Sequence, residues 1–318
     1  MPAVTDACLL MGVLREDGFA GGDIPLDAAA ARRAFEALDT PVGFDDRVRS
    51  AFQLAVAHMA EQITDVVVRH GVDPRDFSLV AYGAAGPMLL PAVLDLVPLR
   101  EVLVPPHPGL FSALGLLSTD LVHYESRSAY LPFTPENAAR IEQVFAEMER
   151  DLRARVGPAA DGLPVQRSFD GRLLGQSWET PFVEMADGAV TPDSIGELVR
   201  RFHDDYAARN GNRFDAFPVE GVTYRVRLTV PAEKVEHRPT GGPAEPVEVA
   251  PDATFVLRHL TPEPLVAGEY VRERLTAGSV VTGPAVIREA LSTTFVLPGQ
   301  RATAGRLGEI VVERAEPR

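Results

Sequence analysis

Apolar residues recur at three- and four-residue intervals between residues 45 and 70, which is the pattern of an amphipathic helix. Gly71 follows as a helix stop, and Asp73-Pro74 indicates a break. The sequence therefore predicts one long helix over residues 45–70, preceded by a shorter Ala- and Arg-rich helix over residues 26–38. The apolar stripe consists of Val48, Phe52, Val56, Met59, Ile63, Val66 and Val67.

Two short apolar runs come next, and each is followed by a turn and a short helical stretch. Residues 77–82 and 101–104 predict strands, while residues 88–94 and 108–115 predict helices. Strands and helices that alternate with short connections are typical of an α/β fold.

The character of the sequence changes near residue 128. Five prolines with Glu and Gly between residues 231 and 251 predict a loop. We therefore expect part of an α/β lobe over residues 1–127 and a mixed α+β, β-rich domain over residues 128–318. In that domain helices are predicted at 135–156 and 192–209, and strands at 165–174, 178–184, 221–230, 285–287, 293–296 and 310–312.

Charge and cysteine content narrow the classes of partner. The 318 residues carry a formal charge of −14, which disfavours nucleic acids and anionic membrane surfaces as partners. The single cysteine, Cys8, cannot form a disulfide within the chain and reads as a small buried residue rather than a reactive thiol. The sequence shows neither a signal peptide nor an apolar run of about 18 residues, so we expect a soluble, cytoplasmic protein.

Candidate chemistry concentrates in the turn Gly83-Ala84-Ala85-Gly86, between a predicted strand and a predicted helix. Backbone N–H groups at the start of a helix attract anions, and glycine allows a ligand to approach the backbone closely. The turn is neither a GxxxxGK[ST] phosphate loop nor a GxGxxG fingerprint. From spacing alone, a tight structural connection between strand and helix is the favoured explanation.

Six sequence blocks resemble, in order and approximate spacing, those of the hydantoinase A / 5-oxoprolinase / acetone carboxylase β-subunit family. They lie at residues 4–7 (Val-Thr-Asp-Ala), 71–77, 79–87, 105–115, 175–177, and 283–287 together with 292–294.

The resemblance implies part of an actin- or hexokinase-like ATPase lobe, in which two lobes close on ATP with Mg²⁺. It implies that Gly83, Ala84, Ala85 and Gly86 hold the adenosine end of the nucleotide, and that Asp6 faces the cleft. A helix-capping role for Asp6 is equally compatible with its position. Family members use ATP to phosphorylate a carbonyl or enolate-type oxygen before ring opening or carboxylation.

Two phosphate loops of the family, of the Asp-Gly-Gly and Gly-Gly-Thr-Ser types, belong upstream of the block that begins here at Val4, and neither occurs in this sequence. We therefore expect the C-terminal half of a split, ATP-dependent amidohydrolase or carboxylase subunit that activates an amide, lactam or ketone. Its expected partners are an N-terminal hydantoinase A-type chain and a hydantoinase B-type subunit, and the chain alone should be inactive. The alternative is a non-catalytic scaffold subunit.

Four departures from the family pattern leave the substrate open. Ala84 stands where glycine is usual, Cys8 stands where asparagine or aspartate usually follows Thr-Asp-Ala, and His58 and His107 stand where asparagine is common. His58 lies beside the apolar stripe and is interpreted as structural. The histidines show no metal-ligand spacing, so no metal site is expected within this chain.

Overall fold

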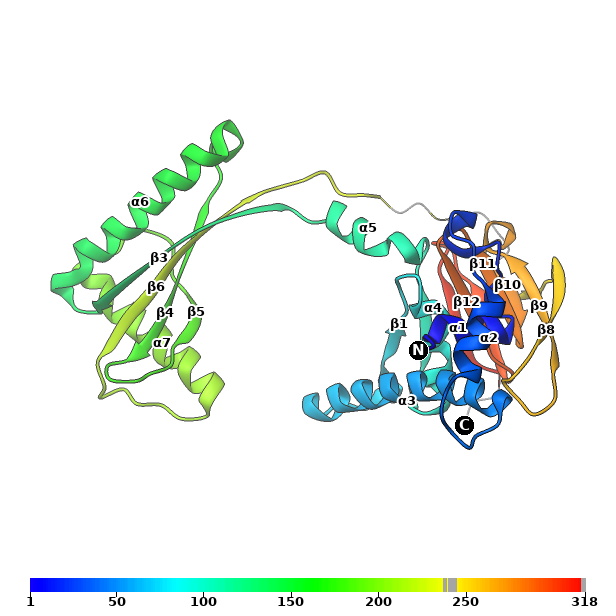
Figure 1. Ribbon diagram of the computed structural model, residues 1–318. Coiled ribbons are helices and arrows are strands. Elements are labelled where there is room, and N and C mark those ends of the chain that lie inside the picture. The colour runs from blue at the N-terminus through cyan, green and yellow to red at the C-terminus, as the bar shows by residue number, and fades with distance from the viewer. Residues whose placement is uncertain (237–238, 240–244, 316–318) are drawn as a thin grey trace. The chain divides into compact units, whose positions relative to one another are not determined.

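The computed structural model describes residues 1–236, 239 and 245–315, and it forms two compact units. Unit 1 consists of Met1–Leu117 together with Val235–Arg318, and unit 2 consists of Ser118–Lys234 (Figure 1). Both units combine helices with sheets, so the expected mixed α/β fold class is confirmed.

The two domains predicted from the sequence, residues 1–127 and 128–318, differ from these two units. The chain leaves unit 1 near residue 118, and its last quarter returns there rather than staying with residues 128–234. The reason is strand pairing: β14 (Ile310–Arg314) pairs antiparallel with β2 (Glu101–Val104) and continues the sheet that β2 begins. Of the predicted proline-rich loop, residues 237–238 and 240–244 lie outside the described residues.

Unit 1 contains two sheets. The larger has the order β1-β2-β14-β13-β10-β7, and the smaller has the order β12-β11-β9-β8. Buried apolar side chains from both sheets and from the helices form one continuous core. The remaining strands are β1 (Ser78–Val80), β13 (Gln300–Ala304), β10 (Ser279–Thr282), β7 (Val247–Glu248), β12 (Ser292–Val296), β11 (Ala285–Glu289), β9 (Leu265–Val271) and β8 (Ala253–Leu257).

The helices of unit 1 confirm most of the predicted ones. The long helix is α3 (Phe44–His70), which ends where Gly71 adopts a left-handed conformation with φ of +62°. The carboxylate of Asp27 accepts a hydrogen bond from the backbone N–H of Ala30 and caps α2 (Ala28–Glu36). The other α-helices of unit 1 are α1 (Val4–Met11), α4 (Gly86–Leu89) and α5 (Phe111–Leu117), and short 3₁₀ helices lie at Leu90–Asp95 and Pro108–Leu110.

Unit 2 is an antiparallel sheet with two helices packed against it. The strand order is β3-β6-β4-β5. Its core is built around large buried aromatic side chains, among them Phe145, Phe202 and Tyr224. The elements are β3 (Leu121–Pro132), α6 (Ala138–Val156), β4 (Val165–Leu173), β5 (Thr180–Glu184), α7 (Ile195–Asn210) and β6 (Val219–Val230).

Strand β3 was not predicted, and its side chains explain why. The half-buried positions of its first part are His123, Glu125 and Arg127 rather than apolar residues. Arg127 pairs with Glu147 of α6 at 2.8 Å, so charge pairing replaces the apolar alternation by which a strand is usually identified.

Among the described residues, no helix combines the length and apolar character needed to cross a membrane.

Candidate functional site

The turn after β1 is held in an unusual backbone conformation. Gly83 has a φ of +78°, in the left-handed region that favours glycine. Its N–H donates to the carbonyl oxygen of Pro108 at 2.7 Å, which ties the turn to the loop after β2. A Cβ atom at residue 83 would meet nothing within 4 Å, so backbone conformation rather than space selects glycine here.

The other three predicted residues divide into two roles. Ala84 and Ala85 are exposed and line a cavity of about 320 Å³. The carbonyl of Ala85 also accepts the N–H of Met88 at 3.1 Å, which opens α4. Gly86 lies behind the turn, where a Cβ would stand 3.4 Å from the carbonyl carbon of Ala81. Ala84 and Ala85 therefore face the cavity, while Gly83 and Gly86 shape the turn.

The opposite wall of the cavity comes from the hairpin between β11 and β12. Leu291, Ser292 and Thr293 line it, and the hydroxyl of Ser292 lies 3.4 Å from the carbonyl of Ala84, its acceptor 208 residues away. Gly109 also lines the cavity, and a Cβ on it would approach that of Leu291 to 2.8 Å. The turn, the loop after β2 and the hairpin are thus packed closely around one hollow.

Apart from Glu289, the rest of the lining is apolar or carries a hydroxyl group. Thr5 of α1, Leu14, Phe19 and Met88 contribute to it. Ligand pockets of this kind combine apolar walls with a few polar groups that fix orientation.

Glu289 is the charged residue of the cavity lining, and it is already paired. Arg272 contacts its carboxylate at 3.0 Å, and both side chains are about nine-tenths buried. Burial raises the pKa of Glu289, although the pairing with Arg272 acts in the opposite direction. Arg272 also donates to the carbonyls of Pro105 at 2.9 Å and Gly308 at 2.7 Å, so its guanidinium is engaged by the protein itself.

This lining fits an uncharged, partly apolar group such as a nucleoside. A triphosphate with Mg²⁺ needs cationic side chains or carboxylate ligands that point at the phosphates. The described residues that line the cavity include no Lys or Arg, and the described chain holds no group of three or more His, Cys, Asp or Glu that could bind a metal. Among the described residues, the lining therefore offers neither a cationic side chain to a phosphate nor a set of ligands to Mg²⁺.

Asp6 does not line the cavity. Its carboxylate accepts the N–H of Ala3 at 2.7 Å and closes the first turn of α1, which is the capping geometry. Its neighbour Thr5 lines the cavity instead.

The remaining candidates lie apart from this cavity. Cys8 is fully buried, and burial raises the pKa of its thiol to about 12, so its interpretation as a buried residue is confirmed. His58 is exposed on α3. His107, with a φ of +51°, lines a second cavity of about 480 Å³ that also reaches Arg272 and Glu289. Gln176 donates to the hydroxyl of Tyr206 at 3.0 Å and stabilises a turn in unit 2.

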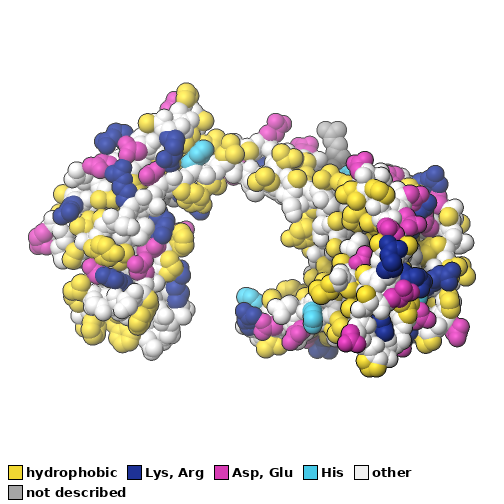
Figure 2. All heavy atoms as spheres, in the orientation of Figure 1, with side chains coloured by type: hydrophobic (Ala, Val, Ile, Leu, Met, Phe, Trp, Pro, Cys, Tyr) yellow, Lys and Arg dark blue, Asp and Glu magenta, His cyan; other side chains and the backbone are white. Residues whose placement is uncertain are grey.

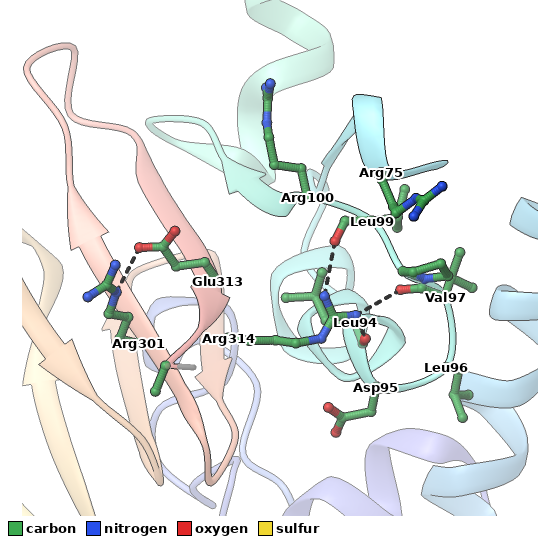
Figure 3. Close-up of a pocket in the computed structure, with 12 residues that line it drawn as sticks. Arg75, Leu94, Asp95, Leu96, Val97, Leu99, Arg100, Arg301, Glu313 and Arg314 are labelled. Atoms are coloured by element: carbon green, nitrogen blue, oxygen red, sulfur yellow. Dashed lines mark hydrogen bonds and ion pairs between the residues drawn. The ribbon is translucent and has the colours of Figure 1, made fainter. Parts of the chain in front are cut away.

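Arginine side chains line a further hollow of unit 1, of about 400 Å³ (Figure 3). Arg314 donates to the carbonyls of Val97 at 3.1 Å and Leu99 at 3.2 Å, and Arg301 pairs with Glu313 at 2.7 Å. These guanidinium groups are used within the protein, where Arg314 fastens β14 to the segment before β2.

Sequence reasoning missed the contribution of residues 289–293 to the cavity. It singled out residues 292–294 as a family block but gave them no place in the site. The signal lies in tertiary packing, since the hairpin and the Gly83 turn are brought together only by the fold.

Comparisons with known proteins show what the chain is similar to in sequence and in fold. Residues 1–125 match the model of the hydantoinase/oxoprolinase family. Over 99% of its length the chain is 25% identical to the acetophenone carboxylase gamma subunit of Aromatoleum aromaticum, and it covers 45% of that protein.

Two solved structures share the fold. A nucleotide-free acetone carboxylase superimposes with a TM-score of 0.78 and 20% identity over 98% of this chain and 46% of its own. The ATP-dependent caprolactamase of Pseudomonas jessenii gives a TM-score of 0.70 and 22% identity over 99% of this chain and 47% of its own. The chain thus spans about half the length of these relatives. These matches confirm the resemblance seen in the sequence: the chain is related to the hydantoinase/oxoprolinase family, whose model matches its residues 1–125.

Proposed function

We propose that this chain supplies the adenosine-binding wall of an ATP site in a hydantoinase/oxoprolinase-type enzyme. In this proposal it is the C-terminal component of a split, cytoplasmic subunit. ATP would phosphorylate the carbonyl or enolate-type oxygen of an amide, lactam or ketone, which activates the substrate for ring opening or carboxylation.

One observation carries the proposal: the cavity between the Gly83 turn and the β11–β12 hairpin has uncharged walls apart from a carboxylate already bound to arginine. Such a hollow suits a base and ribose. The names of the relatives refer to a ketone carboxylase, to ATP-dependent acetone carboxylation and to an ATP-dependent lactamase. They support ATP as the cofactor and a carbonyl group as the target.

The phosphates and Mg²⁺ need groups that this cavity lacks, so we assign them to a partner. That partner is an N-terminal hydantoinase A-type chain with the Asp-Gly-Gly and Gly-Gly-Thr-Ser loops, and a hydantoinase B-type subunit would complete the reaction. Phosphoryl transfer depends mainly on positioning and on neutralising charge around the phosphates, so neither wall alone should support turnover.

The test is co-expression with the polypeptide of the same genome that carries both loops and with the hydantoinase B-type subunit. ATP-dependent turnover of hydantoins, 5-oxoproline and simple ketones is then measured. Turnover by the assembly and none by the isolated chain is the expected result. Robust ATP hydrolysis by the isolated chain would contradict the shared site.

A matched pair of variants tests the cavity itself. Ala84→Phe places a ring in the cavity, and Ala57→Phe places the same ring on an exposed position of α3. We expect only Ala84→Phe to weaken ATP binding by the assembly, by about tenfold or more. An assembly that forms but neither binds nor hydrolyses ATP would favour the scaffold role instead.

A further inference from the structure

We propose that the free edge of β1 and the uncovered C-terminal part of α3 form a docking surface. Its occupant is the polypeptide that corresponds to the rest of the relatives' length, and this polypeptide adds a strand alongside β1. The proposal rests on the proposed function, because the same polypeptide carries the phosphate loops.

The first observation is the open edge of the larger sheet. β1 ends the strand order, and within the described part of the chain no strand lies on its other side. Ala81 directs its N–H to the carbonyl of Leu103 in β2, at 2.8 Å. Alternate residues of a strand direct their backbone groups to opposite edges, so those of Ser78 and Val80 point to the free edge.

Apolar side chains flank this edge. Phe77, Val80 and Tyr82 are 47%, 43% and 51% exposed. Proteins usually protect a free edge with charged residues, with proline or with a covering segment. An apolar edge of this kind is typical of a strand that pairs with another polypeptide.

The second observation is that α3 is longer than the core it covers. Val48, Phe52, Val56 and Ala60 are buried, whereas none of residues 61–70 is. Ile63 is half-buried and still packs against the core, and the seven residues after it extend the helix by about 10 Å at the rise of an α-helix. Figure 1 shows the C-terminal end of α3 extending past β1, and in Figure 2 it projects from unit 1 with hydrophobic side chains among the charged ones.

The apolar stripe nevertheless continues past the last residue that packs against the core. Val66 follows Ile63 at helical spacing, on the face that packs against the core farther upstream. Val66 is 54% exposed. A stripe that keeps its periodicity beyond the core is explained if a further layer packs beneath it.

The occupant follows from the length of the relatives. This chain covers 45–47% of the three relatives described above and is aligned to them along nearly its whole length. More than half of each relative therefore has no counterpart here. Since β1 directly precedes the Gly83 turn, a polypeptide docked on its free edge would lie close to the turn that lines the cavity.

The experiment uses the full chain, co-expressed with the polypeptide of the same genome that carries both phosphate loops. Val66→Asp places a charge on the stripe, and Val68→Asp places it on the opposite face of the same helix, where Val68 is 70% exposed. Val80→Pro removes the N–H that points to the free edge, a change that edge strands tolerate. Thermal unfolding of each isolated variant checks that the fold is retained.

We expect Val66→Asp and Val80→Pro to weaken association by about tenfold or more, and Val68→Asp to change it by less than about twofold. We also expect amide exchange across residues 78–80 to slow in the complex.

Three outcomes would overturn the proposal. A complex that forms equally well with every variant, with unchanged exchange across residues 78–80, would remove the docking surface and leave the proposed function standing. If no complex forms and no ATP-dependent turnover appears, both fail together. A dimer of the isolated chain that Val80→Pro dissociates would assign the surface to a second copy.

Discussion

The backbone N–H of Gly83 donates to the carbonyl oxygen of Pro108 over 2.7 Å. This bond joins the turn after β1 to the loop after β2, and the next residue of that loop, Gly109, packs against Leu291 of the β11–β12 hairpin. The wall of the candidate site therefore depends on contacts among three segments that are distant in sequence. Its geometry should respond to changes at the turn that leave the rest of unit 1 intact.

Replacement of Gly83 by alanine tests this dependence. A side chain in the left-handed conformation costs about 1 kcal/mol, so Gly83→Ala should lower the free energy of unfolding by that amount. Gly71→Ala is the matched control, since Gly71 has a φ of +62°, a Cβ there would meet no atom within 4 Å, and the residue ends α3 away from the cavity. Both variants should lose similar stability in urea unfolding, and only Gly83→Ala should weaken ATP binding by the assembly. Equal ATP affinities would mean that the turn does not shape the site.

Variants of Asp6 test whether its carboxylate caps α1 or takes part in the nucleotide cleft. Its bond to the N–H of Ala3 predicts that Asp6→Ala lowers the free energy of unfolding by about 1 kcal/mol. Asp6→Asn keeps an acceptor oxygen and should lose less than half of that. The geometry predicts unchanged ATP turnover of the assembly with Asp6→Asn. A large fall in turnover at full stability would instead give Asp6 the cleft position that the family resemblance implies.

The sequence predicted elements whose signals are local. The stripe of α3, its stop at Gly71, strand β2 and the turn at Gly83 all follow from periodicity or from backbone preferences of single residues. The domain division differs because the pairing of β14 with β2 joins residues about 200 positions apart, and no local pattern encodes that partner.

Only part of the candidate site was predicted from the sequence. Ala84 and Ala85, which the sequence singled out, line the cavity, while the hairpin residues Leu291 and Ser292 enter it only through tertiary packing. Asp6 shows the limit of a family position as evidence, because the same carboxylate satisfies a helix cap. The sequence therefore predicted the wall formed by the turn at residues 83–86, whereas the wall formed by the β11–β12 hairpin became apparent only from the structure.

Cys8 offers a test of burial in α1. Burial raises the pKa of its thiol from 9.0 to about 12, so the folded chain holds the proton more tightly than the unfolded chain does. The buried, protonated thiol of Cys8 therefore contributes fully to the stability of the fold below about pH 9, and this contribution is lost as the pH rises toward 12. Iodoacetamide at pH 8 should leave the native chain unmodified and should add one carbamidomethyl group in urea, as measured by mass spectrometry. Rapid labelling of the native chain would contradict the buried position of Cys8.

Two glycines of unit 2 should respond to alanine in opposite directions. At Gly221 in β6, a Cβ would stand 2.7 Å from the ring carbon Cζ of Tyr224, which is fully buried. Overpacking of this kind costs about 1–3 kcal/mol, so Gly221→Ala should destabilise unit 2. At Gly196 in α7, a Cβ would meet nothing within 4 Å. Because alanine favours the helix, Gly196→Ala should raise the free energy of unfolding by up to about 1 kcal/mol.

The single tryptophan provides the measurement for this pair. Trp178 belongs to unit 2, so its fluorescence during urea unfolding follows that unit. The midpoint should fall for Gly221→Ala and rise for Gly196→Ala. A midpoint unchanged in Gly221→Ala would mean that Tyr224 can move aside, and that the close contact between β6 and this ring does not fix the core of unit 2.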